Sequence, residues 1–113
     1  MGNLIDYEYK PTRGEAVSGL QSIANGAALT IRPAVGETWV IEMISFGGAC
    51  TIAFTDGTLN NAIATETAAD VANNQVIEKA NYTITRDDYI TVTNTSGATA
   101  VFGYNGFKVH ENI

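Results

Sequence analysis

The stretch PAVGETWVIEMISFGGACTIAFTDG, residues 33–57, decides the fold and holds the chain's only tryptophan and only cysteine. Within it, residues 37–46 are apolar at most positions. In a strand, alternate side chains point to opposite faces. The two sets are Trp39, Ile41 and Met43 on one face, and Val40, Ile44 and Phe46 on the other. A run that is apolar on both faces predicts a central strand covered on both sides.

The second half of this stretch predicts a half-buried strand between two turns. Gly47-Gly48 marks the first turn and Asp56-Gly57 the second. Between them, Cys50, Ile52 and Phe54 alternate with Thr51, Ala53 and Thr55. Cys50 on an apolar face is predicted to be a small buried hydrophobic residue.

Working outward, short runs rich in Thr, Val, Ile and aromatic residues continue through the chain, separated by Gly, Asn and Asp. This spacing is typical of an all-β sandwich or barrel. The predicted strands are residues 15–23, 28–33, 37–46, 49–55, 75–80, 82–85, 89–94 and 99–110. We therefore predict an all-β fold: a single-domain antiparallel β-sandwich, jelly-roll-like, with about eight strands.

Several side chains are assigned to faces by the same alternation. The inward set is Leu29, Ile31, Tyr82, Ile84, Ile90 and Val92, while Val17 and Leu20 are expected to anchor the first strand. The last strand places Val101, Phe107 and Val109 on one face and Phe102 and Tyr104 on the other. Residues 58–74 are rich in Ala, Thr and Asn, and the pattern leaves a short helix and a partly paired loop equally open.

The N-terminus is predicted to be an extended arm over residues 1–13, followed by the sandwich domain over residues 14–113. Tyr7 and Tyr9 alternate with Asp6 and Glu8, and Leu4 and Ile5 precede them. In an extended segment both tyrosines face one side. We predict that Leu4, Ile5, Tyr7 and Tyr9 bind a partner or a neighbouring subunit, the alternative being a disordered tail.

Charge excludes several classes of partner. The chain has 113 residues, a net charge of -6 and only 16% charged residues. The six basic residues are scattered, whereas phosphate binding needs a concentrated basic patch, so neither nucleic acid nor an anionic membrane is an expected partner. The N-terminus lacks the pattern of a signal peptide, and one cysteine cannot form an intrachain disulfide.

The sequence offers no catalytic constellation. His110 is the only histidine, and a usual zinc site needs several His or Cys ligands. Glu37 and Glu42 fall on opposite faces of one strand, so they cannot act as a glycosidase pair by themselves. We predict no enzyme activity, no metal and no cofactor, and interpret His110 as a solvent-exposed terminal residue.

A family resemblance adds a biological setting. Four motifs carry it: PAVGETWVIE, FTDG, DDYITVTN and YNGF, within residues 27–109. With them the chain resembles small β-sandwich proteins of tailed bacteriophage virions, which include capsid decoration (cement) proteins and head- or tail-fibre domains. The resemblance implies that Trp39 and Ile41 are core residues and that Asp56-Gly57 and residues 104–106 shape turns.

The resemblance also implies a function. A decoration protein of this kind is made in the host cytoplasm, trimerises, and sits on the outer surface of the virion, where it binds the major capsid protein and stabilises contacts between capsid subunits. The alternative is a receptor- or glycan-binding module that displays loops such as residues 58–74. A hydrolase or isomerase would need clustered His and carboxylate ligands, which one histidine cannot supply.

Overall fold

The computed structural model describes the backbone of residues 11–111 and the side chains of residues 14–109. Over this range the chain forms eight β-strands and one short helix. Their bounds are β1 Pro11–Ile23, β2 Ala28–Ile31, β3 Thr38–Phe46, β4 Cys50–Thr55, β5 Asn60–Glu66, α1 Ala68–Ala72, β6 Ile77–Thr85, β7 Tyr89–Asn94 and β8 Ala100–Glu111.

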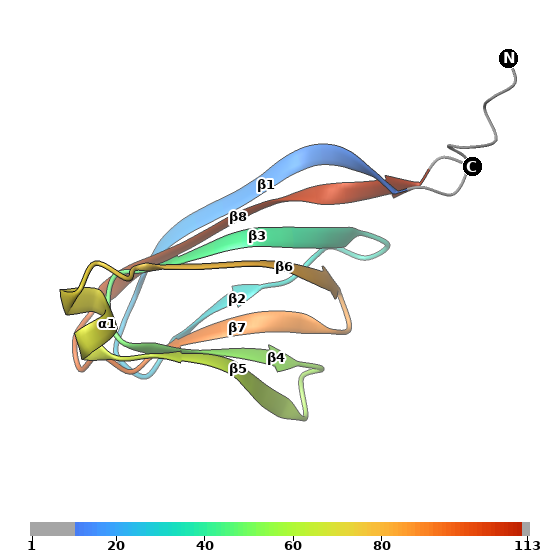
Figure 1. Ribbon diagram of the computed structural model, residues 1–113. Helices are drawn as coiled ribbons and strands as arrows, with labels where there is room; N and C mark the ends of the chain where they lie inside the picture. The colour runs from blue at the N-terminus through green and yellow to red at the C-terminus, as the bar shows by residue number, and fades with distance from the viewer. Residues whose placement is uncertain (1–10, 112–113) are drawn as a thin grey trace, which may run out of the picture.

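The strands form two four-stranded antiparallel sheets that face each other (Figure 1). Sheet 1 has the order β1-β8-β3-β6 and sheet 2 the order β2-β7-β4-β5. The pairs β1/β8, β2/β7, β3/β6 and β4/β5 are nested, as if one long hairpin were wound around itself. This winding is that of a jelly roll, so the predicted all-β antiparallel sandwich is confirmed.

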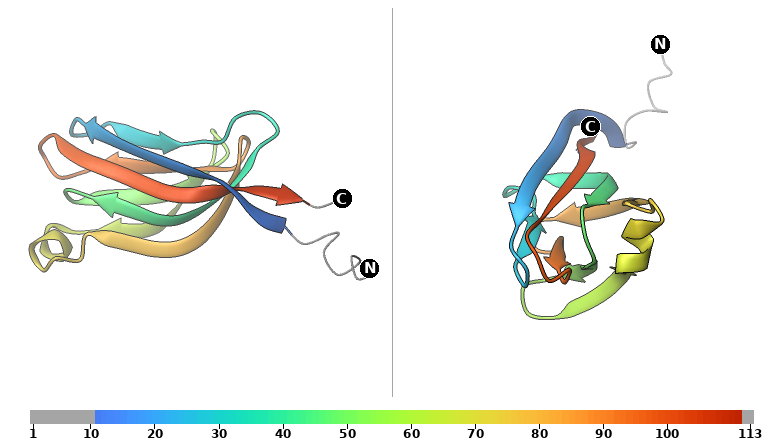
Figure 2. Two further views of the ribbon diagram at one scale, coloured as in Figure 1. Left: turned by 90° about the horizontal axis from the view of Figure 1, so that it is seen from above. Right: turned by 90° about the vertical axis from the view of Figure 1, so that its left-hand side faces the viewer.

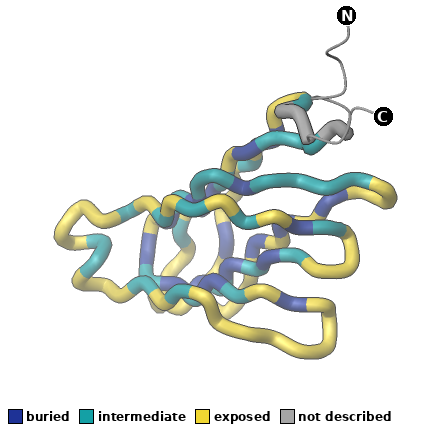
Figure 3. Tube along the Cα trace, turned by 45° about the vertical axis from the view of Figure 1, so that its right-hand side comes forward, coloured by how far each residue is buried: buried dark blue, intermediate teal, exposed yellow. Residues whose placement is uncertain are grey.

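The core lies between the two sheets, where the buried residues of Figure 3 gather. It consists of Val17, Ile23, Leu29, Ile31, Ile41, Ile44, Phe46, Cys50, Ile52, Ile84, Ile90, Val92 and Phe102. Most are β-branched or aromatic, which suits both strand backbone and packing between sheets. Each fully buried isoleucine contributes about 2 kcal/mol through burial of its apolar surface.

The prediction that residues 37–46 form a strand covered on both faces is wrong, because the alternation of faces is broken within β3. The register of β3 shifts at Glu42, because Ile41 pairs with Gly106 and Met43 with the adjacent Asn105. A bulge of one residue returns the following side chains to the face they would otherwise have left. Ile44 and Phe46 therefore join Ile41 in the core, and β3 is covered on its inner face only.

The end of β4 also departs from simple alternation. Cys50 and Ile52 are buried as predicted, but Phe54 is 38% exposed and Thr55 only 4%. The Thr55 hydroxyl donates to the Leu59 carbonyl and accepts from the Gly57 amide, both at 2.9 Å. The predicted Asp56-Gly57 turn is confirmed, and by folding back it covers Thr55.

Strands β1 and β8 run past the rest of sheet 1 as a two-stranded ribbon (Figures 1 and 2). Pairing of β8 with β3 ends at Lys108, whereas pairing with β1 continues to Glu111. Strand β1 begins at Pro11, inside the range expected as an arm. Val17 is buried and anchors this strand as predicted, but Leu20 does not, because its side chain is 76% exposed on the outer face.

Other elements refine the predicted strand count. Residues 75–80 and 82–85 form one strand, β6, whose register shifts opposite the β3 bulge. The eighth strand is instead β5, and residues 58–74 contain both pairing and a helical turn. Residues 104–106 were implied to shape a turn; they lie inside β8, where they pair with β1 and β3.

Candidate functional site

The predicted partner-binding residues Leu4, Ile5, Tyr7 and Tyr9 lie outside the described residues. Their role stays a prediction. His110 lies within β8, where its backbone pairs with Thr12.

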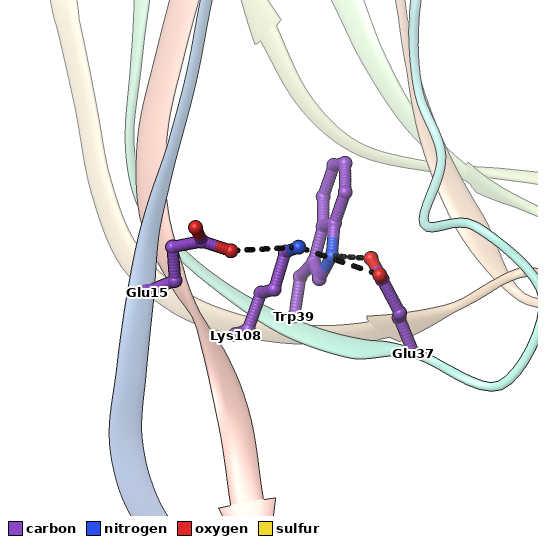
Figure 4. Close-up of polar contacts among 4 residues, drawn as sticks. All are labelled: Glu15, Glu37, Trp39 and Lys108. Carbon is purple, nitrogen blue, oxygen red and sulfur yellow. Dashed lines mark hydrogen bonds and ion pairs between the residues drawn. The ribbon is translucent and has the colours of Figure 1, made fainter.

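A polar cluster fastens the ribbon to the sandwich where β1 and β8 leave it (Figure 4). Lys108 Nζ lies 3.0 Å from Glu15 Oε1 and 3.3 Å from Glu37 Oε2. The Trp39 indole N–H donates to Glu37 Oε1 at 2.9 Å. One cation thus connects β1, β8 and the loop before β3.

Electrostatics in this cluster favour the charged forms. The hydrogen bond from Trp39, together with Lys108, holds the pKa of Glu37 below its ordinary value. Hydrogen bonds to Glu15 and Glu37 raise the pKa of Lys108. Glu37 and Lys108 are therefore stabilised in their ionised states, and their contact holds β8 to the loop before β3.

Trp39 is half-buried and packs against the core, as the resemblance implied. Its ring stacks on Tyr104 with centroids 6.4 Å apart. Its N–H is bonded to Glu37 and its ring contacts Tyr104, so the indole takes part in packing within the sandwich. Because residues 58–74 form β5 and α1, the loop invoked for glycan binding is also largely occupied by regular structure.

A second group of acidic residues bridges the neighbouring ends of β5 and β6. Burial is the main cause that raises the pKa of Glu66, and the neighbouring Glu78 raises it further. The Tyr82 hydroxyl donates to Glu78 Oε2 at 3.0 Å, and burial together with Glu78 raises the pKa of Tyr82 to about 12. Asp70 caps α1 through the Thr67 amide. Within the described part of the chain, no three His, Cys, Asp or Glu side chains are grouped to hold a metal ion.

Cys50 is a free cysteine with no exposed surface, as predicted. Burial raises its pKa to about 12, so the thiol stays protonated and unreactive at neutral pH.

The outer face of sheet 1 carries three exposed aliphatic side chains. Leu20, Val101 and Ile77 are 76%, 47% and 45% exposed. The register places Leu20, Gly103, Ser45 and Ile77 in one row across all four strands. Three further apolar residues of this face, Val40, Met43 and Phe107, are half-buried. We call this set the sheet-1 outer face.

The outer face of sheet 2 is built differently. Its register aligns one row of Thr30, Thr91, Ala53 and Ala62 and another of Ala28, Thr93, Thr51 and Thr65. We call these eight residues the sheet-2 outer face. It carries no large hydrophobic side chain, and its threonines favour strand backbone while presenting hydroxyls.

Comparison with known proteins identifies the fold and no family. No model of a known protein family matches the sequence, and no curated protein matches it. A subunit of the disulfide-linked pili formed by Bacillus endospore appendages is 17% identical, with 94% of each chain covered and a TM-score of 0.54. The Drosophila NLP core, described in relation to pentamer formation and histone binding, is 13% identical over 82% of this chain and 98% of that chain, with a TM-score of 0.50.

These likenesses show a shared β-sandwich, because at such identity only the fold is comparable. Both of these proteins form assemblies, a pilus in one case and a pentamer in the other. No helix in the described residues is long and apolar enough to cross a membrane.

Proposed function

We propose that this chain is a non-enzymatic structural protein that works as a subunit of a protein assembly. The observation that carries the proposal is the sheet-1 outer face, where Leu20, Val101 and Ile77 are exposed together. Exposed aliphatic side chains gathered on one sheet face mark a candidate interaction site, since exposing them to water is unfavourable. The assembling sandwiches that share the fold, the pilus subunit and the pentamer core, support the same role.

The subunits of the Bacillus pilus are linked by disulfides, and we propose a different means of assembly for this chain. Here the only cysteine, Cys50, is fully buried. We therefore propose non-covalent contacts, with the apolar outer face supplying most of the contact energy.

The specific assembly that we propose is a tailed-phage head, on which the protein acts as a decoration protein bound to the major capsid protein. The motif resemblance supports this assignment, and so does a jelly roll with one apolar outer face. A protein that binds only the assembled shell stabilises it by mass action, and many copies add their effects. The proposed location is the outer surface of the virion.

Two measurements test this function. Mass spectrometry of purified particles should detect the chain at a stoichiometry set by capsid symmetry. Particles that lack it should lose DNA at a lower temperature and under milder osmotic shock than complete particles. Its absence from particles, or equal resistance of particles without it, would refute the decoration role.

The surface assignment is tested separately with two matched variants. Leu20→Ser, Val101→Ser and Ile77→Ser together should abolish binding to undecorated particles. The control combines Thr30→Ser, Thr91→Ser and Thr93→Ser on the sheet-2 outer face and should bind normally. If the control loses binding and the sheet-1 variant keeps it, the wrong face has been assigned.

A further inference from the structure

Each sheet has two edge strands, and three of the four edges are protected. Strand β2 has only four residues and is followed closely by Pro33. Strand β5 is interrupted at Ile63, which the register with β4 skips. Strand β6 has a register shift between Lys79 and Tyr82. Short length, nearby proline, bulges and lysine are the devices by which proteins block pairing at an edge.

From Ala16 to Ile23, the edge of β1 lacks these protections. After an irregularity between Arg13 and Ala16, its register with β8 is unbroken to Ile23. The segment Ala16–Ile23, AVSGLQSI, contains no charged residue and no proline. Among the described residues β1 pairs only with β8, so its other side carries backbone N–H and C=O groups that no strand pairs.

This edge is also accessible, and an aromatic ring packs against its backbone. Ser18, Leu20, Gln21 and Ser22 are exposed. On the inner side, the Tyr104 ring lies so close to Gly19 that a Cβ there would sit 2.5 Å from a ring carbon. An aromatic ring laid over a strand glycine supports the backbone at a point that would otherwise be weak.

We propose that Ala16–Ile23 of β1 pairs antiparallel with the same segment of a second copy of this chain. The two copies of sheet 1 then form one continuous eight-stranded sheet about a two-fold axis. A two-fold contact uses the same surface on both subunits and closes with two copies. This inference deepens the proposed function, because it names the first partner in the assembly and doubles the apolar outer face.

Charge favours a second copy as the occupant. The chain carries a net charge of -6, so two copies repel unless they meet through neutral surface. Ala16–Ile23 is neutral, and so are Val101, Gly103 and Asn105 beside it on β8. The nearest acidic side chain on β1, Glu15, is already paired with Lys108.

The pairing predicts where Leu20 lies. Directly opposed residues of an antiparallel pair point to the same face. Registers that keep both outer faces on one side place Leu20 opposite Ser18, Leu20 or Ser22 of the second copy. In each case the two exposed leucines meet near the axis, at the centre of the doubled outer face.

The first test measures mass by sedimentation velocity at concentrations up to about 100 µM with the full chain. The wild type is expected to be a dimer. Leu20→Lys places like charges at the axis and should raise the dissociation constant at least about 100-fold. Thr30→Lys, which adds the same charge to the exposed edge strand β2, should leave it unchanged.

The second test uses cysteine cross-linking. Because Cys50 is buried, Leu20→Cys introduces the one accessible thiol among the described residues. Mild oxidation should yield a covalent dimer of Leu20→Cys and little of the control Thr30→Cys. This readout does not depend on the behaviour of the lysine variant.

Three outcomes would overturn the pairing. The first is a monomeric wild type, and the second is a trimer that Leu20→Lys leaves intact. The third is loss of the dimer when residues 2–10 are deleted, because this result would assign the β1 edge to the N-terminal arm. The trimer outcome, combined with detection of the chain in particles, would leave the proposed function standing. If the chain is absent from particles but still forms the dimer, the decoration role is refuted and the pairing through β1 stands.

Discussion

The outer faces of the two sheets differ although their inner faces share one core. The sheet-1 outer face exposes Leu20, Ile77 and Val101, whereas the sheet-2 outer face presents rows of threonine and alanine. Sheet 1 also has the longer strands, bulges in β1 and β3, and the projecting ribbon. Sheet 2 has shorter strands and one bulge, in its edge strand β5.

This difference distinguishes two roles of a sheet in a sandwich: its inner face buries the core, and its outer face meets water or another protein. Either sheet can bury an apolar inner face, and threonine suffices where the other face meets water. In an isolated domain, polar side chains could replace large exposed aliphatic side chains without loss of stability. The proposed function assigns the contacts with other proteins to sheet 1, where Leu20, Ile77 and Val101 are exposed. Sheet 2 also has two partly exposed hydrophobic side chains, Phe54 at 38% and Ile63 at 37%, but they lie outside its threonine and alanine rows.

The largest expected effect comes from Gly106, beside the β3 bulge that shapes sheet 1. A Cβ at Gly106 would collide with the Val40 carbonyl oxygen and the Ile41 Cα, which are backbone atoms. Gly106→Ala should therefore lower the free energy of unfolding by about 3 kcal/mol. Chemical denaturation measures this change.

Gly36→Ala is the control for Gly106. It meets no atom within 4 Å, but its φ of +80° is unfavourable for alanine, which costs about 1 kcal/mol. A smaller loss for Gly106→Ala than for Gly36→Ala would show that β3 shifts easily and that the bulge does not fix sheet 1.

Asn94 tests the connection between the sheets. It is fully buried at the end of β7, and its amide nitrogen donates to the Ile23 and Ala98 carbonyls at 2.8 Å. Asn94→Ala should cost about 2 kcal/mol, because two acceptors lose their donor. Thermal unfolding measures the loss, and Asn105→Ala, at an exposed position, is the control. Equal stability of both variants would mean that water replaces the amide.

Exchanging the character of the outer faces should alter association more than stability. Replacing Leu20, Ile77 and Val101 with threonine should change the unfolding free energy by less than about 1 kcal/mol while abolishing association. Replacing Thr30, Thr91 and Thr93 with valine should create a new tendency to associate. Light scattering at matched concentrations distinguishes these outcomes, and association by the first variant would contradict the assignment of the faces.

The smallest effects are in the pH dependence, where two glutamates should act in opposite directions. The pKa of Glu37 is lowered from 4.5, so its contribution is present above that pH and lost as the pH falls through the lowered value. The pKa of Glu66 is raised from 4.5, so stability decreases as the pH rises above that value.

The corresponding variants should therefore differ in sign at about pH 7. Glu37→Gln should be less stable than the wild type there, and Glu66→Gln more stable. At about pH 3, where both carboxyls approach protonation, both differences should shrink. Denaturation midpoints at the two pH values provide the test, and a destabilised Glu66→Gln at neutral pH would contradict it.

The sequence alone determined the class of fold, because strand alternation and turn residues are local properties. The inward positions of Leu29, Ile31, Ile90 and Val92 followed from a period of two, and Asp56-Gly57 from turn chemistry. Buried Cys50 was predictable for the same reason. The alternation failed at Glu42, since a bulge depends on which strand lies opposite.

Only the tertiary structure decided which surfaces remain for function. Leu20 and Val17 look alike in sequence, yet one is exposed and the other buried, because β1 is an edge strand whose outer face nothing in the described chain covers. Lys108 meets Glu37 across 71 residues, and Asn94 meets Ile23 across another 71. Such contacts are set by the winding of the jelly roll, which brings distant strands together by packing rather than by any local pattern.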